Sequence, residues 1–295
     1  MKKSLPIILV VCMLVFGVFL LFYPDISSWH NARIQQGLLD TVESRLAELE
    51  AEYIEYHFER AREYNDALNG GRIQDPFVAG SGAVLPPAYY LETLNIDGVM
   101  ARITIPKLNI NLPVFHTTSY DVLNRGVGHI EGTSFPIGGT GTHSVLTGHS
   151  GLAHARMFTP LLDGGIVEGD LFFIHVLGET LAYEVEEILT VWPHEIETLR
   201  IAQNADYITL VTCTPYAVNS HRLLVRGARI PYEPEMELAI EPIVEAGLDI
   251  RTVIVASFAA LFLLGLLIYK IAESRRNRAR ELAQLRQLEL EWRRK

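Results

Sequence analysis

The sequence predicts a mainly-β domain, closed or sandwiched, with a helical segment before it and an apolar membrane-spanning segment on each side. Between residues 100 and 230 the chain consists of short runs rich in Val, Ile, Thr, Phe and Tyr, bounded by Gly, Pro and Asp. The region before it has apolar residues at helical spacing. Two uncharged apolar runs lie near the two ends of the 295 residues.

Residues 1–4 are expected to form a cytoplasmic N-terminus and residues 5–23 a transmembrane helix. The run LPIILVVCMLVFGVFLLFY carries no charge, is long enough to cross a hydrocarbon core, and follows Lys2 and Lys3. A cleaved signal peptide is the alternative, because it also combines a basic start with an apolar core. The length of the run, and the lack of a small-x-small cleavage site in the following PDISSWH, favour an uncleaved anchor.

An extracellular helical segment is predicted for residues 24–71, with one helix from residue 27 to residue 68. The apolar residues at helical spacing are Leu38, Leu39, Val42, Leu46, Leu49 and Tyr53. No proline interrupts this helix, and Asn-Gly-Gly at residues 69–71 ends it. Residues 72–99 are expected to form a loop and lead-in, because Gly and Pro are frequent there, and long ordered loops tend to be lids or binding loops.

Residues 100–230 are expected to form the β domain, which is long enough for a single core. The predicted strands include ARITIP, HSVLTGH, DLFFIHV, LAYEVEEILTVW, DYITLVTC and HRLLVRGARI. An acidic linker at residues 231–251 then leads to a second predicted transmembrane helix at residues 252–271. Residues 272–295 form a basic cytoplasmic tail.

The distribution of charge orients the chain. Lys and Arg beside a span mark the cytoplasmic side, so both termini are expected to be cytoplasmic and residues 24–250 extracellular. This middle segment contains 13 basic and 31 acidic residues, a net charge of −18. Such a charge argues against a nucleic-acid partner and against contact with an anionic bilayer. A basic protein partner would suit it, and so would a requirement for solubility alone.

Cys213 is the only cysteine between the two apolar runs, since Cys12 lies inside the first. A single free thiol in an oxidising exterior is either buried and inert or retained for its reactivity. Cys213 ends the strand-like run YITLVTC, and Pro215 follows it closely, which puts the thiol where a strand meets a loop. A core cysteine at the end of a strand is the alternative.

His149 and Arg222 are candidate partners of this thiol. His149 ends the strand-like run SVLTGH, and an imidazole can shuttle protons for a thiol nucleophile. Arg222 follows Cys213 across a turn-containing loop, so the two strands are expected to be adjacent and the guanidinium to stabilise an oxyanion. On the residues alone, the competing candidates are His116, His129, His143, His154, His175, His194, His221, Arg226 and Arg229.

The segment TLVTC at residues 209–213 matches the TLxTC signature of the sortases, and TGH ending in His149 and the downstream Arg222 match that family's other catalytic positions. The stretches ITIPKLNINLPVFH and TLVTCTPYAVNSHRLLVRG resemble the pilus-associated, class C, sortases of Gram-positive bacteria. The resemblance covers about residues 73–230 and the two-span topology. It implies a sortase-type closed β-barrel and a cysteine transpeptidase with nucleophile Cys213, acid/base His149 and oxyanion-stabilising Arg222, with no cofactor and no metal.

Two features indicate class C. Asp75, Pro76 and Phe77 resemble the lid motif that covers the cleft in these enzymes, with an ordinary Asp-Pro turn as the alternative. The second span is a feature that housekeeping class A sortases generally lack. Ser150 is a departure, because many relatives carry Arg or Lys directly after the catalytic His. The charge at the mouth of the cleft is therefore expected to differ.

The resemblance implies that the substrates are pilin or surface proteins with an LPxTG-like sorting signal near the C-terminus. Cys213 would form a thioester at the Thr–Gly bond, and a pilin lysine would resolve it into an isopeptide bond. A housekeeping sortase that anchors proteins to the cell wall is the main alternative. A hydrolytic cysteine protease, whose papain-like motif is absent, and a membrane-bound scaffold with an inert Cys213 are the others.

Overall fold

The computed structural model describes residues 5–68, 88–152, 154–162, 164–195 and 199–242, with further positions between residues 256 and 282. The chain divides into two units, one formed by Met1–Phe22 with Glu245–Lys295 and the other by Tyr23–Val244. Within the described residues, no helix combines the length and the apolarity needed to cross a bilayer. The two transmembrane helices therefore stay predictions.

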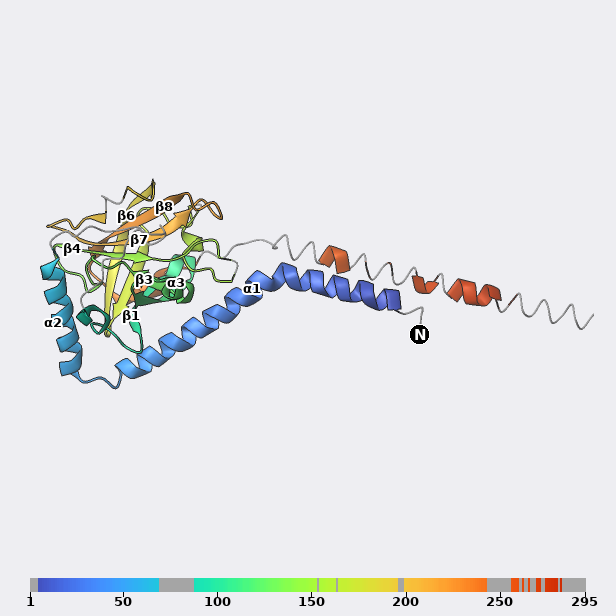
Figure 1. Ribbon diagram of the computed structural model, residues 1–295, viewed down its shortest axis with the longest axis horizontal. Helices are drawn as coiled ribbons and strands as arrows, with labels where there is room; N and C mark the ends of the chain where they lie inside the picture. Colours follow the sequence, from blue (N-terminus) through green and yellow to red (C-terminus); the bar gives the residue numbers. More distant parts are fainter. Residues whose placement is uncertain are drawn as a thin grey trace, which may run out of the picture. The chain divides into compact units, whose positions relative to one another are not determined.

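Two long helices precede the barrel where the sequence predicts one (Figure 1). Helix α1 spans Leu5–Leu46 and continues through Pro24, and helix α2 spans Ala51–Ala67. The break between them lets apolar side chains of both segments reach the core: Val42, Leu46, Leu49 and Ile54 pack against it, and Phe58, Ala61 and Tyr64 belong to it. The predicted single helix is wrong at residues 47–50, because packing contributes more to helix stability than local propensity does.

Eight strands form a closed barrel. They are β1 (Val99–Ile105), β2 (Ile110–His116), β3 (Val127–His129), β4 (Thr142–Thr147), β5 (Leu171–Val176), β6 (Glu179–Val191), β7 (Asp206–Thr214) and β8 (His221–Ile230). Their order around the barrel is β1-β2-β3-β4-β7-β8-β6-β5. The β2–β3 and β4–β7 pairs are parallel, and the other pairs are antiparallel. The predicted mainly-β closed barrel is confirmed, and the six quoted runs coincide with β1, β4, β5, β6, β7 and β8.

Short helices lie between and after the strands. They are η1 (Ala88–Leu91), η2 (Pro106–Leu108), α3 (Tyr120–Arg125), η3 (Thr159–Leu161) and α4 (Pro234–Ala239). Helix α4 lies in the predicted acidic linker and returns to the barrel. The Thr104 hydroxyl donates to the Glu237 carboxylate over 2.7 Å, and His175 Nε2 lies 3.3 Å from the same carboxylate. The start of the linker is thus attached to β1 and β5.

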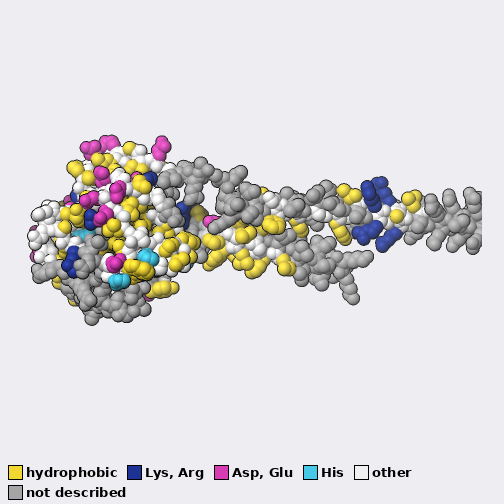
Figure 2. Space-filling model, turned by 90° about the horizontal axis from the view of Figure 1, so that it is seen from above, with side chains coloured by type: hydrophobic (Ala, Val, Ile, Leu, Met, Phe, Trp, Pro, Cys, Tyr) yellow, Lys and Arg dark blue, Asp and Glu magenta, His cyan; other side chains and the backbone are white. Residues whose placement is uncertain are grey.

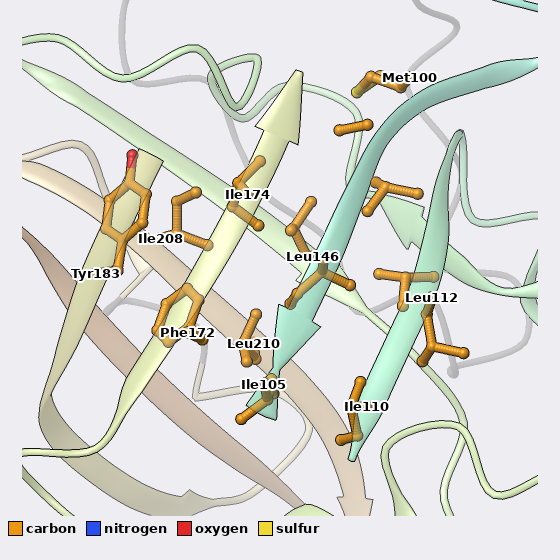
Figure 3. Close-up of a cluster of buried hydrophobic side chains, with 14 of the residues drawn as sticks. Met100, Ile105, Ile110, Leu112, Leu146, Phe172, Ile174, Tyr183, Ile208 and Leu210 are labelled. Atoms are coloured by element: carbon orange, nitrogen blue, oxygen red, sulfur yellow. The ribbon is translucent and has the colours of Figure 1, made fainter. Parts of the chain in front are cut away.

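The barrel interior is filled by aliphatic and aromatic side chains, some of which are drawn in Figure 3. Ile103 and Ile105 of β1, like Phe172 and Ile174 of β5, are separated by one residue and are fully buried. Alternate residues of a strand face the same side, so these positions point inward together. Each such side chain contributes about 1.5–3 kcal/mol relative to an exposed one.

Strand β7 is buried on both faces. Every residue from Ile208 to Cys213 is buried, and a second apolar cluster formed by Ile130, Val145, Leu199, Val211 and Leu224 covers the side away from the main core. Burial on two sides explains why β7 reads as a nearly continuous apolar run. It also gives the candidate nucleophile a rigid support. Elsewhere the surface is acidic, and Figure 2 shows Asp and Glu side chains spread over the visible face of the barrel.

Candidate active site

Cys213 and Arg222 are directly opposite each other on neighbouring strands. Their Cα atoms are register partners in the antiparallel β7–β8 pair, so both side chains point to the same face of the sheet. Both residues are nearly buried, with 6% and 4% of their surface exposed. The expectation that the loop after Cys213 returns the chain to an adjacent strand is confirmed.

The loop that joins the two strands holds the guanidinium of Arg222. Arg222 Nη1 donates to the carbonyls of Asn219 at 3.2 Å and His221 at 3.1 Å. The loop is itself a tight turn, because the amides of Val218 and Asn219 both donate to the carbonyl of Pro215. A fixed cation beside the sulfur is an arrangement that can stabilise a developing oxyanion without reorganisation.

His149 reaches the same region from strand β4. Strands β4 and β7 are parallel, and Thr147 is the register partner of Val211. His149 and Cys213 each lie two residues beyond that pair, so both emerge at the same edge of the sheet. Partial burial lowers the pKa of His149, and the nearby His154 lowers it further. The lowered pKa favours the neutral imidazole, which is the form that can accept a proton.

Backbone contacts around His149 fix its position. The Gly148 amide donates to the carbonyl of Val211 over 3.1 Å, and the Phe158 amide donates to the carbonyl of His149 over 3.0 Å. Gly148 has to be a glycine, because a Cβ there would lie 2.9 Å from the Phe158 ring. The glycine of the TGH motif therefore allows the chain to pass close to that ring.

Exposed apolar side chains surround this edge. Tyr216 and Val218, in the loop between Cys213 and Arg222, are 54% and 67% exposed. Trp192, which follows the residue paired with Arg222 on β6, is 50% exposed, and its ring centroid lies 4.1 Å from that of His221. These residues were not singled out from the sequence. An aromatic residue directly after a strand end was the available signal.

The competing histidines have other surroundings. Four are hydrogen-bonded at the barrel, and burial is the main cause that lowers the pKa of each: His116, His129, His143 and His175. His221 precedes Arg222 and points to the opposite face of β8. His154 and His194 lie in connections between strands.

The competing arginines are farther along β8 and are paired with carboxylates. Arg226 Nη2 lies 3.0 Å from Glu187, and Arg229 Nη1 lies 3.9 Å from Asp206. Four residues along a strand correspond to about 13 Å, so Arg226 is well separated from Arg222. Arg222 is therefore the arginine of β8 that is positioned opposite the thiol.

Two further predictions concern the surroundings of the site. Asp75, Pro76 and Phe77 lie outside the described residues, so the lid stays a prediction. In the part of the chain that the structure describes, no group of three or more His, Cys, Asp or Glu side chains is arranged to hold a metal ion.

Comparison with known proteins identifies the family. The family model described as the sortase domain matches residues 103–230. Sortase C-1 of Actinomyces oris is 46% identical, with a TM-score of 0.56, and the match covers 61% of this chain and 99% of that one. For sortase C-1 of Streptococcus pneumoniae the values are 40% identity, a TM-score of 0.62, and coverage of 67% and 100%.

A more distant relative is sortase D of Bacillus subtilis, which is 25% identical over 142 residues. That match covers 47% of this chain and 66% of the relative's length. The triad-bearing strands β4, β7 and β8 all lie within the matched sortase domain. The chain belongs to the sortase family of cysteine transpeptidases, and its solved relatives are class C sortases.

Proposed function

We propose that this chain joins pilin subunits by transpeptidation, with Cys213 as nucleophile, His149 as general acid and base, and Arg222 as the oxyanion-stabilising residue. The single observation that supports this most strongly is the cross-strand pair of Cys213 and Arg222. A buried thiol and a buried guanidinium on the same face of a rigid sheet have no evident packing purpose, since a buried charge is costly to desolvate.

The reaction would proceed in two halves. The sulfur of Cys213 attacks the Thr carbonyl of an LPxTG-like sorting signal, and the tetrahedral oxyanion forms beside Arg222. The Thr–Gly C–N bond breaks, His149 gives a proton to the departing Gly amine, and a thioester remains on Cys213. The amine of a pilin lysine then loses a proton to His149 and attacks the thioester. The thiol leaves, and an isopeptide bond joins the two subunits.

The apolar rim is suited to an apolar peptide. Trp192, Tyr216 and Val218 are exposed beside Arg222, and burying them under the Leu-Pro part of a sorting signal would remove apolar surface from water. Binding energy from this part of the substrate would orient the Thr–Gly bond toward the sulfur.

The membrane arrangement is part of the same proposal. The apolar runs at residues 5–23 and 252–271 would span the membrane, with the barrel outside the cell and both termini in the cytoplasm. The helical stretch at residues 274–280 contains four arginines, which supports a cytoplasmic tail. An enzyme tethered in this way would meet membrane-held substrates at a raised effective concentration.

The lid at residues 75–77 is proposed on sequence resemblance alone. If Asp75 and Phe77 cover the thiol, replacing both with Ala should speed alkylation of Cys213 by iodoacetamide, measured in a Cys12→Ala background. An unchanged rate would exclude the lid without affecting the proposed chemistry.

The product of the reaction distinguishes the candidate functions. The chain, a sorting-signal peptide and equal amounts of a lysine-containing pilin peptide and a cell-wall stem peptide would be incubated and analysed by mass spectrometry. The pilin polymerase predicts a conjugate to the pilin lysine that is lost in Cys213→Ala. A stem-peptide conjugate would indicate the housekeeping function, free acid alone a hydrolase, and full activity of Cys213→Ala in cells the scaffold.

A further inference from the structure

We infer that Ser150 is a positioning residue for this reaction. Its hydroxyl donates to the backbone carbonyl of Cys213 over 2.5 Å, and only 6% of the residue is exposed. The bond connects the residue after His149 directly to the residue that carries the thiol. This role rests on the proposed function, because it concerns the geometry between His149 and Cys213.

The bond of Ser150 extends the ladder between β4 and β7. Carbonyls two residues apart on a strand point the same way, so those of Val211 and Cys213 both face β4. The Val211 carbonyl accepts from the amide of Gly148. At the next position the strand β4 has ended, and the Ser150 side chain supplies the donor that the ladder no longer provides. Pairing is thereby maintained up to the nucleophile.

A second side chain holds the other side of His149. The Thr212 hydroxyl donates to the carbonyl of Gly148 over 2.7 Å, and Thr212 is fully buried. Thr212 and Ser150 thus attach the residues immediately before and after His149 to β7. The bond of Ser150 is the one that reaches the backbone of Cys213 itself.

Removing the hydroxyl of Ser150 would act on catalysis more than on binding. The exposed rim of Trp192, Tyr216 and Val218 has no printed contact through Ser150, so substrate binding should change little. The separation of His149 and Cys213 would lose its direct restraint, and a displacement of 1 Å between reacting groups can cost about 100-fold in rate. This effect requires the hydroxyl oxygen, which Thr retains and Ala lacks.

The experiment compares Ser150→Ala, Ser150→Thr and the control Ser144→Ala. Ser144 lies on β4, is 2% exposed, and its hydroxyl has no hydrogen-bond partner among the described residues. The full chain in mild detergent would be assayed for kcat and KM with a sorting-signal peptide and an amine, and for its melting temperature. We expect Ser150→Ala to lower kcat roughly 10- to 100-fold with KM within about twofold of wild type. We expect Ser150→Thr to restore most of the turnover and Ser144→Ala to retain it.

Several results would overturn the role of Ser150. Full kcat in Ser150→Ala, a Thr variant no better than Ala, or a loss that appears mainly in KM would each do so. If Ser150→Ala does not fold, high turnover in a folded Ser150→Thr supports the role, and failure of both variants to fold shows that Ser150 is only structural. An inactive wild-type chain would instead count against the proposed function.

Discussion

Two histidines are buried in the neutral form beside the barrel, and this predicts a loss of stability in mild acid. His129 Nε2 donates to the carbonyl of Ser134 over 2.8 Å, so its Nδ1 accepts the hydroxyl of Tyr90 at 2.8 Å. His116 Nε2 donates to the carbonyl of Thr93 over 2.7 Å. Burial lowers the pKa of His129 to about 3 and that of His116 to about 4.

The sign follows from the difference between the folded and unfolded states. The unfolded chain has histidines with a pKa near 6.5, so between pH 7 and pH 5 it takes up protons that the folded chain does not. The stabilisation is complete above about pH 6.5 and is lost as the pH falls toward the folded-state pKa values. Each histidine should lose about 2 kcal/mol between pH 7 and pH 5, and the two together about 4 kcal/mol. That is a large share of a typical stability of about 5–15 kcal/mol.

Urea unfolding of residues 24–250 at pH 7 and pH 5 would measure this loss. Burial raises the pKa of Glu131, which acts in the opposite sense, so variants are compared with wild type instead of using the total. His116→Gln and His129→Gln should each be less stable at pH 7 but should lose about 2 kcal/mol less than wild type on going to pH 5. The exposed His194→Gln serves as the control. Equal pH dependence in wild type and both buried-site variants would refute the reasoning.

Three substitutions test the packing, each by urea unfolding at pH 7. Gly227→Ala would push a methyl group into the ring of Phe172 and should cost about 1–3 kcal/mol. Gly37→Ala in helix α1 has open space around it and should instead gain up to about 1 kcal/mol, so a similar loss at both sites would contradict the structure. Asn65→Ala would leave the buried amide of Phe135 without its 2.7 Å partner and should cost about 1–3 kcal/mol; an unchanged midpoint would show that α2 is not held there.

The strands were predictable because their composition is unambiguous, with one exception. Strand β2 contains Pro113, and proline within a run argues against a central strand. In the structure Pro113 pairs with Arg102 on β1, whereas the pairing with β3 begins only at Val114. Pro113 therefore has no strand partner on the β3 side, which explains why it is tolerated.

The candidate site was only partly predictable. The adjacency of Cys213 and Arg222 followed from a short loop between two strands, which is a local relation. The approach of His149 depends on the parallel pairing of β4 with β7, which are separated by two other strands in the sequence. Such non-local pairing cannot be derived from composition, and only the family resemblance indicated it. The role of Ser150 likewise depends on that pairing.

The break after Leu46 shows a similar limit. Helical spacing continues through residues 47–50, so the sequence pattern alone predicts one helix. The side chains of Leu46 and Leu49 pack against the core, and this tertiary contact decides where the helix ends.

The most direct test of the central claim is intact-protein mass spectrometry of the acyl-enzyme. The chain would be mixed with a sorting-signal peptide without an amine acceptor, and peptide mapping would locate the adduct. The proposal predicts an acyl group on Cys213 that ends at the Thr residue, is discharged by an added lysine amine, is absent in Cys213→Ala and accumulates more slowly in Arg222→Lys. A signal that is cleaved at the same rate by wild type and Cys213→Ala, or an adduct on another residue, would contradict it.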